Sequence, residues 1–122
     1  MTHTTKIVLV VGDEFATRIV VTKALREAGF QVIAAASADE AVIILTARAA
    51  VDLILTDFRM PGSMNGLGLA RLVRRTRPKV KVVFLSADAG DCSLRAWGHG
   101  FLSKPCDTAS IVKTVTNVLA AA

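Results

Sequence analysis

Two aspartates, a serine and a lysine lie at the ends of separate apolar runs in this sequence: Asp13, Asp57, Ser86 and Lys104. A carboxylate can attack a phosphoryl group when a divalent cation, a hydroxyl and an ammonium neutralise charge on the phosphoryl oxygens. Two neighbouring carboxylates favour a bound cation, and a set of oxygen ligands with open positions suits Mg²⁺ rather than zinc. The four side chains therefore predict magnesium-assisted transfer of a phosphoryl group to a carboxylate.

The elements that position these residues are predicted from apolar, β-branched runs that alternate with segments of helical periodicity. The predicted strands are 6–11, 31–35, 52–56, 80–85 and 100–103. The predicted helices are 15–29, 37–49, 66–77, 91–97 and 107–119. The alternation predicts a flavodoxin-like (βα)5 fold of the α/β class, with a five-stranded parallel sheet in the order 2-1-3-4-5 and helices on both faces. Ligands bind at the carboxyl edge of such sheets, where the four side chains would meet.

The first predicted helix has an apolar periodicity of its own. Phe15, Ile19, Thr22 and Leu25 recur at helical spacing, which is typical of one face of an amphipathic helix. Gly29 follows them and is placed to end the helix with a residue in the left-handed conformation.

Length and composition predict one globular domain over residues 1–122. The 122 residues are 52% hydrophobic and 20% charged, which suits a single compact core. The apolar runs are too short to span a membrane and the first residues lack the layout of a secretory signal, so we expect a cytoplasmic protein without a membrane partner. Cys92 and Cys106 match no zinc or disulfide pattern and are interpreted as reduced thiols.

The net charge of +5 is unevenly distributed. No acidic residue occurs between Asp57 and Asp88. Within that interval, six cationic residues lie between positions 71 and 81, namely Arg71, Arg74, Arg75, Arg77, Lys79 and Lys81. A basic patch can steer an acidic partner or nucleic acid. Basic residues are also favoured near a helix C-terminus by the helix dipole. We favour the second interpretation and do not expect nucleic-acid binding, because no aromatic residues are interleaved with the basic ones.

Five segments, which span nearly the whole chain, resemble the motifs of response-regulator receiver domains in two-component signalling. Residues 10–14 (VVGDE) resemble the acidic turn, and residues 55–61 (LTDFRMP) resemble the phosphoacceptor strand and loop. Asn65-Gly66 is similar to the turn that opens the third helix of that family. Residues 85–87 (LSA) resemble the strand end with a hydroxyl residue, and residues 101–105 (FLSKP) resemble the lysine strand.

The resemblance implies a role for each matching residue. Asp57 would be the phosphoacceptor, phosphorylated by a histidine kinase or a histidine phosphotransfer protein. The Mg²⁺ ligands would be Asp13, Asp57 and the backbone carbonyl of Arg59. The phosphate-binding and switch residues would be Ser86, Lys104 and Phe101. Loop-shaping roles would fall to Met60, Pro61 and Pro105, the last after a cis peptide bond. No enzymatic activity is expected beyond phosphorylation and dephosphorylation of the chain itself.

Two features depart from the family pattern. Gly12 stands where the family usually has the first of two adjacent acids, so we expect weaker Mg²⁺ binding and slower phosphorylation. The eighteen-residue step from Ser86 to Lys104 is shorter than usual by about one helical turn, which abbreviates the predicted helix 91–97.

Several alternatives stay open. The chain is either a phosphorylatable switch or a degenerate receiver that binds a partner without phosphorylation, and it is either stand-alone or a piece of a hybrid kinase. Phe101 is either a switch residue or plain core, and Trp97 is either a partner anchor or core. Asp13 can cap the first helix as well as bind a metal. The downstream target is not indicated by the sequence.

Overall fold

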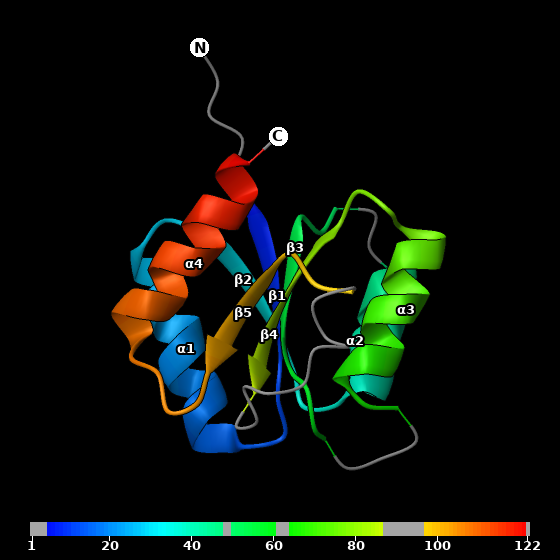
Figure 1. Ribbon diagram of the computed structural model, residues 1–122, viewed down its shortest axis with the longest axis horizontal. Helices are drawn as coiled ribbons and strands as arrows, with labels where there is room; N and C mark the ends of the chain where they lie inside the picture. The colour runs from blue at the N-terminus through cyan, green and yellow to red at the C-terminus, as the bar shows by residue number, and fades with distance from the viewer. Residues whose placement is uncertain (1–4, 48–49, 61–63, 87–96, 122) are drawn as a thin grey trace.

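The computed structural model describes residues 5–47, 50–60, 64–86 and 97–121. All strand pairs are parallel, and the strand order is β2-β1-β3-β4-β5 (Figure 1). The strands are β1 (Ile7–Val11), β2 (Gln31–Ala35), β3 (Leu53–Asp57), β4 (Lys81–Ser86) and β5 (Gly100–Ser103). The predicted flavodoxin-like sheet and its order are therefore confirmed, with strand ends that differ from the prediction by one residue at most.

Helices cover both faces of this sheet, as predicted. They are α1 (Phe15–Glu27), α2 (Ala38–Ala47), α3 (Gly66–Thr76) and α4 (Thr108–Ala120). Helices α1 and α4 lie on one face, and α2 and α3 lie on the other (Figure 1). The predicted short helix 91–97 falls almost entirely outside the described residues. Within the described residues, no helix is long and apolar enough to cross a membrane.

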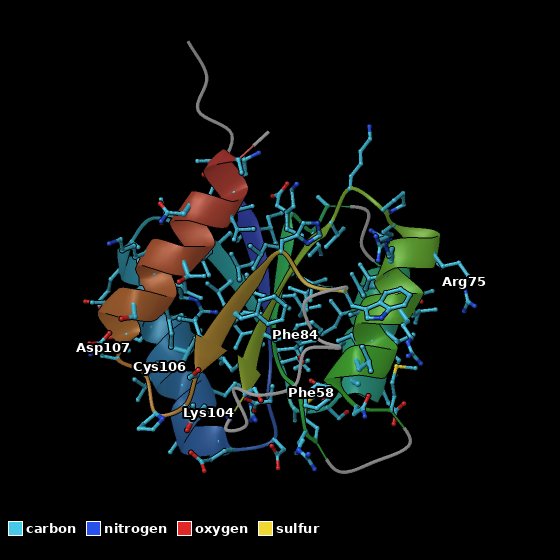
Figure 2. All side chains as sticks on the ribbon, viewed as in Figure 1. Phe58, Arg75, Phe84, Lys104, Cys106 and Asp107 are labelled. Atoms are coloured by element: carbon cyan, nitrogen blue, oxygen red, sulfur yellow. The ribbon has the colours of Figure 1, made fainter. Side chains whose placement is uncertain are left out.

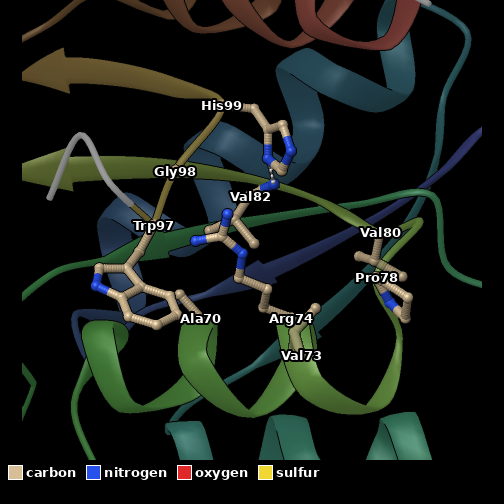
Figure 3. A pocket seen from close by; sticks show the side chains of 9 residues that line it. All are labelled: Ala70, Val73, Arg74, Pro78, Val80, Val82, Trp97, Gly98 and His99. Carbon is tan, nitrogen blue, oxygen red and sulfur yellow. Dashed lines mark hydrogen bonds between the residues drawn. The ribbon is translucent and has the colours of Figure 1, made fainter.

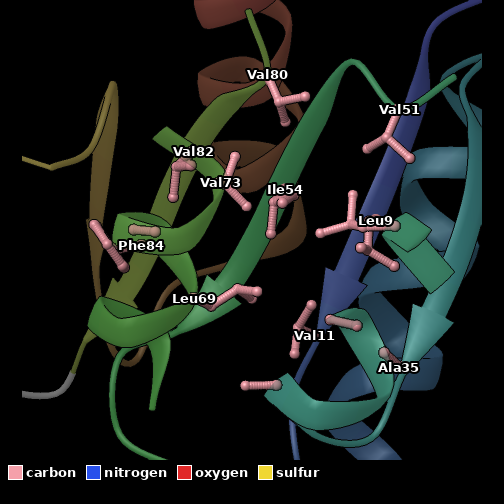
Figure 4. Close-up of a cluster of buried hydrophobic side chains, with 14 of the residues drawn as sticks. Leu9, Val11, Ala35, Val51, Ile54, Leu69, Val73, Val80, Val82 and Phe84 are labelled. Atoms are coloured by element: carbon pink, nitrogen blue, oxygen red, sulfur yellow. The ribbon is translucent and has the colours of Figure 1, made fainter. Parts of the chain in front are cut away.

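Successive residues of each strand supply two separate cores. In β1, Val8 and Val10 pack toward α1 and α4, whereas Leu9 and Val11 pack toward α2 and α3 (Figure 4). All five residues of β1 are buried, and so are all five of β3. A strand that is covered on both faces needs apolar side chains in both directions, which explains the absence of polar alternation in the sequence.

The face of helix α1 that is buried differs from the predicted apolar face. Thr22 and Leu25 are buried as that face requires, but Phe15 is 66% exposed and Ile19 is 49% exposed. Val21 takes a buried position instead. The helix carries apolar residues around much of its circumference, so periodicity alone does not determine which face meets the sheet. The predicted stop at Gly29 is confirmed by its φ of 100°, in the left-handed region.

Candidate functional site

Asp57 is the last residue of β3 and lies at the carboxyl edge of the sheet. It is only 5% exposed. The Nζ atom of Lys104, which follows β5, lies 2.6 Å from Oδ1 of Asp57. Figure 2 labels Lys104 beyond the end of β5, at the edge toward which the strand arrows point. The structure thus brings together two of the predicted site residues in a direct ion pair.

The backbone around Asp57 is fixed by contacts with two neighbouring segments. The amide of Phe58 donates to the carbonyl of Leu85 at 2.9 Å, and the amide of Gly66 donates to the carbonyl of Phe58 at 2.9 Å. A Cβ atom on Gly66 would stand 2.2 Å from the carbonyl oxygen of Asp57. The start of α3 therefore packs against the end of β3 at a distance that only glycine permits.

Burial raises the pKa of Asp57 above its ordinary value of 3.8, because the charged form loses solvation. The Lys104 ammonium acts in the opposite direction, and the charges of Asp13 and Glu14 raise the pKa further. The Lys104 ammonium, 2.6 Å from Oδ1, lowers the pKa through a side-chain hydrogen bond as well as through its charge.

We expect Asp57→Asn to raise the free energy of unfolding at neutral pH in the absence of divalent cations. In the parent protein, ionising a buried carboxyl with a raised folded pKa costs stability. That cost is absent below 3.8, where both states are protonated, and it grows as the pH rises through the folded-state pKa. Urea denaturation in EDTA at neutral pH and at about pH 4 should show the gain shrinking on acidification. A gain that is the same at both pH values would contradict this assignment.

The turn after β1 brings Gly12 against Asp57. A Cβ atom at position 12 would lie 2.9 Å from Oδ2 of Asp57, so the carboxylate occupies space that a side chain would need. The backbone carbonyl of Gly12 accepts a hydrogen bond from Arg18 of α1 at 2.7 Å. Glu14 is the N-cap residue of α1, and its carboxylate accepts a hydrogen bond from the hydroxyl of Thr17. Glu14 therefore makes a local contact in the first turn of α1, while its charge also acts on Asp57.

A divalent cation fits this edge of the sheet on charge and donor chemistry. The negative charges of Asp13 and Glu14 act on Asp57, and Lys104 supplies one nearby positive charge. Within the described residues, no group of three histidine, cysteine or acidic side chains forms a metal cage. Magnesium commonly binds through one or two carboxylates and keeps several waters, so this sparse donor set suits it better than zinc.

Two more of the predicted site residues, Ser86 and Pro105, lie along the same edge. Ser86 is buried at the end of β4, and its carbonyl accepts the amide hydrogen of Lys104 at 2.8 Å. The peptide bond between Lys104 and Pro105 is cis, as the resemblance implied. Met60 packs against the core on the α2 and α3 face. Pro61 lies outside the described residues.

The ligand role of the Arg59 backbone carbonyl stays a prediction. The contact that the structure describes for this residue involves its side chain. The guanidinium lies over the ring of Phe58, 5.9 Å from the ring centroid.

An aromatic cluster beside the site was not predicted. Phe58 and Phe84 meet edge to face with centroids 6.2 Å apart, and Phe84 stacks on Phe101 at 5.8 Å. Phe84 is fully buried, and a Cβ atom on Gly98 would lie 2.7 Å from its ring. Phe101 is only partly buried. The sequence signal was an aromatic residue in the centre of a buried strand, which is indistinguishable from ordinary core.

A parallel sheet in this order, with an acid at the end of its central strand paired to a lysine after its edge strand, is the arrangement of a receiver domain. Residues 8–116 match the family model described as "Response regulator receiver domain". The chain belongs to this family, whose members act in two-component systems with histidine kinases and downstream effectors.

Two relatives illustrate the sequence likeness. The sensor kinase CckA of Brucella abortus is 37% identical over 117 residues, which cover 92% of this chain and 12% of that protein. The DNA-binding transcriptional regulator NtrC of Klebsiella pneumoniae is 31% identical over 114 residues, which cover 90% of this chain and 24% of that protein. The chain therefore spans a quarter or less of the length of these relatives.

Solved structures show the same fold. The response regulator TrrA of Thermotoga maritima, in complex with Mg²⁺ and BeF, matches with a TM-score of 0.83 and 27% identity, covering 93% of this chain and 98% of that one. The chemotaxis protein CheY4 of Vibrio cholerae matches with a TM-score of 0.85 and 25% identity, covering 94% of this chain and 99% of that one.

Proposed function

We propose that Asp57 accepts a phosphoryl group in a magnesium-dependent reaction and that the chain acts as a signalling switch. The observation that carries this proposal is the buried carboxylate of Asp57, held 2.6 Å from the Lys104 ammonium at the carboxyl edge of the sheet. The described residues share one sheet with a core on each face, which supports a single receiver domain over residues 1–122.

The proposed step is transfer from a phosphohistidine of a histidine kinase or a histidine phosphotransfer protein. A carboxylate oxygen of Asp57 forms a bond to phosphorus, the phosphorus–nitrogen bond breaks, and its electron pair stays on the imidazole. Lys104 and the hydroxyl of Ser86 stabilise charge on the phosphoryl oxygens. Magnesium, held by Asp13, Asp57 and the Arg59 carbonyl, would neutralise further charge on the same oxygens when bound.

The test is phosphorylation by a small donor. The protein is incubated with Mg²⁺ and acetyl phosphate, and intact mass is measured for one added phosphoryl group, with Asp57→Asn as the control. A magnesium-dependent adduct that the control lacks supports the switch. If no adduct forms even with a kinase partner supplied, the chain is instead a degenerate receiver that binds partners without phosphorylation, an alternative favoured by Gly12.

We expect Gly12→Asp to raise Mg²⁺ affinity roughly tenfold, because affinity in oxygen sites rises with the number of charged ligands. The new side chain must displace the Asp57 carboxylate, whose Oδ2 lies 2.9 Å from the added Cβ position. Calorimetric titration with MgCl₂ measures the affinity. Gly12→Asn is the matched control, since it brings the same displacement without the charge. Equal affinities of the aspartate and asparagine variants would show that the missing acid does not limit Mg²⁺ binding.

A further inference from the structure

Helix α1, blue in Figure 1, carries an exposed apolar surface that the fold does not use. Phe15 is 66% exposed, Ile19 49% and Val20 53%. Among the residues that the structure describes, only one other large hydrophobic side chain is exposed, Ile43 of α2. Phe15 and Ile19 are one helical turn apart and Val20 follows directly, so the three side chains gather on one side of the helix. Single exposed apolar residues are ordinary, but a patch of this kind marks an interaction surface.

A groove of about 510 Å³ lies along this surface, between α1 and β2. Apolar and charged side chains share its lining, namely Phe15, Arg18, Ile19, Thr22, Lys23, Arg26, Glu27 and Ala34. The two arginine residues are anchored to the backbone, since Arg18 donates to the carbonyl of Gly12 at 2.7 Å and Arg26 donates to that of Val32 at 3.1 Å. Lys23 is an exposed lysine and is therefore the cation of this groove best placed to meet a partner.

Charge is unevenly distributed along α1. Glu14 is exposed at the beginning of the helix, and Lys23 is exposed in its second half. Glu14 precedes Ile19 by five residues and Lys23 follows it by four, which is about 7.5 Å and about 6 Å along the helix axis. Arg26 and Glu27, further along, carry opposite charges. Two copies of α1 that cross antiparallel at Ile19 therefore place Glu14 of each copy close to Lys23 of the other.

We propose that two copies of this chain associate through the exposed surface of α1, as an antiparallel pair with twofold symmetry. Ile19 and Val20 of the two copies would meet at the centre. Phe15 of each copy would enter the groove of the other beside Lys23, and Glu14 would pair with Lys23 twice. A twofold contact needs a surface that is complementary to itself, and an apolar centre between an acidic end and a basic end meets this requirement.

The expected dimer is reversible. One helix from each copy makes a small interface, so we expect a Kd of about 10–100 µM. A membrane fits this surface less well than a second copy does. Helices that lie on membranes present cations to anionic lipids, whereas the exposed carboxylates of Asp13, Glu14 and Glu27 would be repelled by them.

This surface is separate from the phosphoryl chemistry. Ile19, Val20 and Lys23 take no part in the proposed transfer, so self-association can be measured on the unphosphorylated chain without Mg²⁺. Its failure would leave the proposed role of Asp57 untouched. The cavity of about 340 Å³ beside Trp97 (Figure 3) belongs to the opposite face of the sheet and takes no part in this surface.

The first test is sedimentation equilibrium of the full chain in EDTA, at concentrations from about 10 µM to about 1 mM. We expect a reversible equilibrium between monomer and dimer. Ile19→Ser should weaken dimerisation at least tenfold. Ile43→Ser is the matched control, because Ile43 is 68% exposed and belongs to α2 on the opposite face of the sheet (Figure 1). It should leave dimerisation unchanged.

Charge reversal tests the antiparallel orientation. Glu14→Lys and Lys23→Glu each place like charges opposite one another in a homodimer, so each variant should self-associate at least tenfold more weakly than the parent chain. A mixture of the two variants restores both ion pairs and should form a heterodimer with a Kd within about threefold of the parent value. The Glu14 side chain makes no capping hydrogen bond, so lysine at this position should leave α1 folded, which circular dichroism checks.

NMR spectra locate the contact. An isotopically labelled Lys23→Glu chain is titrated with the unlabelled Glu14→Lys chain, and the amide shifts should centre on residues 15–26. Five results would overturn the proposal: a monomer at every concentration, unchanged dimerisation of Ile19→Ser, no heterodimer in the mixture, shifts centred outside α1, or binding of a monomeric parent chain to anionic phosphatidylserine vesicles that Ile19→Ser abolishes.

Discussion

Lys104→Met should slow phosphorylation of Asp57 by acetyl phosphate roughly a hundredfold, the usual effect of removing one donor that stabilises transition-state charge. The Nζ atom lies 2.6 Å from the carboxylate of Asp57, the proposed phosphoacceptor, so its positive charge would be in place for incoming phosphoryl oxygens. Methionine keeps the length of the side chain and removes the charge. The rate of adduct formation by intact mass, at saturating Mg²⁺, measures the effect.

Lys113→Met is the matched control, because Lys113 is an exposed lysine of α4 and is not among the charges that shift the pKa of Asp57. It should phosphorylate at the parental rate. Loss of the Lys104 charge should also raise the pKa of Asp57, since the ammonium is the group that lowers it. A Lys104→Met variant that is phosphorylated within about threefold of the parent rate would show that the ion pair serves structure rather than chemistry.

Phe84→Ala should reduce the free energy of unfolding by about 3–5 kcal/mol, the range for truncation of a buried phenylalanine. The Phe84 side chain is fully buried and packs between Phe58 and Phe101, with Gly98 closely against its ring. No neighbouring backbone can move in to fill the space, because β4 is paired on both sides. Urea denaturation of the unphosphorylated chain gives the value.

Phe15→Ala provides the same chemical change at an exposed position. Phe15 is 66% exposed, so we expect its removal to change stability by no more than about 0.5 kcal/mol. Similar losses for the two variants would contradict the packing role assigned to Phe84. A loss near 1 kcal/mol for Phe84→Ala would show that the core around Gly98 collapses into the vacated volume.

The fold was largely predictable from the sequence because each strand is an uninterrupted apolar run. In a parallel sheet with helices on both faces, the central strands are buried along their whole length, as β1 and β3 are here, so apolar runs such as 53–57 indicate a strand. The buried face of helix α1 was harder to predict. Phe15 and Ile19 continue an apolar periodicity that the sheet does not use, and only tertiary packing selects Val21 and Leu25 for the core.

The candidate site was predictable in its membership but not in its contacts. Asp57 and Lys104 follow separate strands, and the topology alone places them at one edge. The proximity of Gly12 to Oδ2 of Asp57 depends on the conformation of a turn, which periodicity does not encode. The cavity beside Trp97 was also missed, because its walls come from α3, β4 and the segment before β5, which are distant in sequence.

The alternation of two cores along each strand also limits how such a chain can change length during evolution. In β1, Val8 and Val10 serve one core while Leu9 and Val11 serve the other. Deleting one residue within the strand would exchange the occupants of both cores from that point onward. Insertions and deletions are therefore compatible with this architecture mainly in the connections, so new binding specificities are expected to arise there while the strands keep their length.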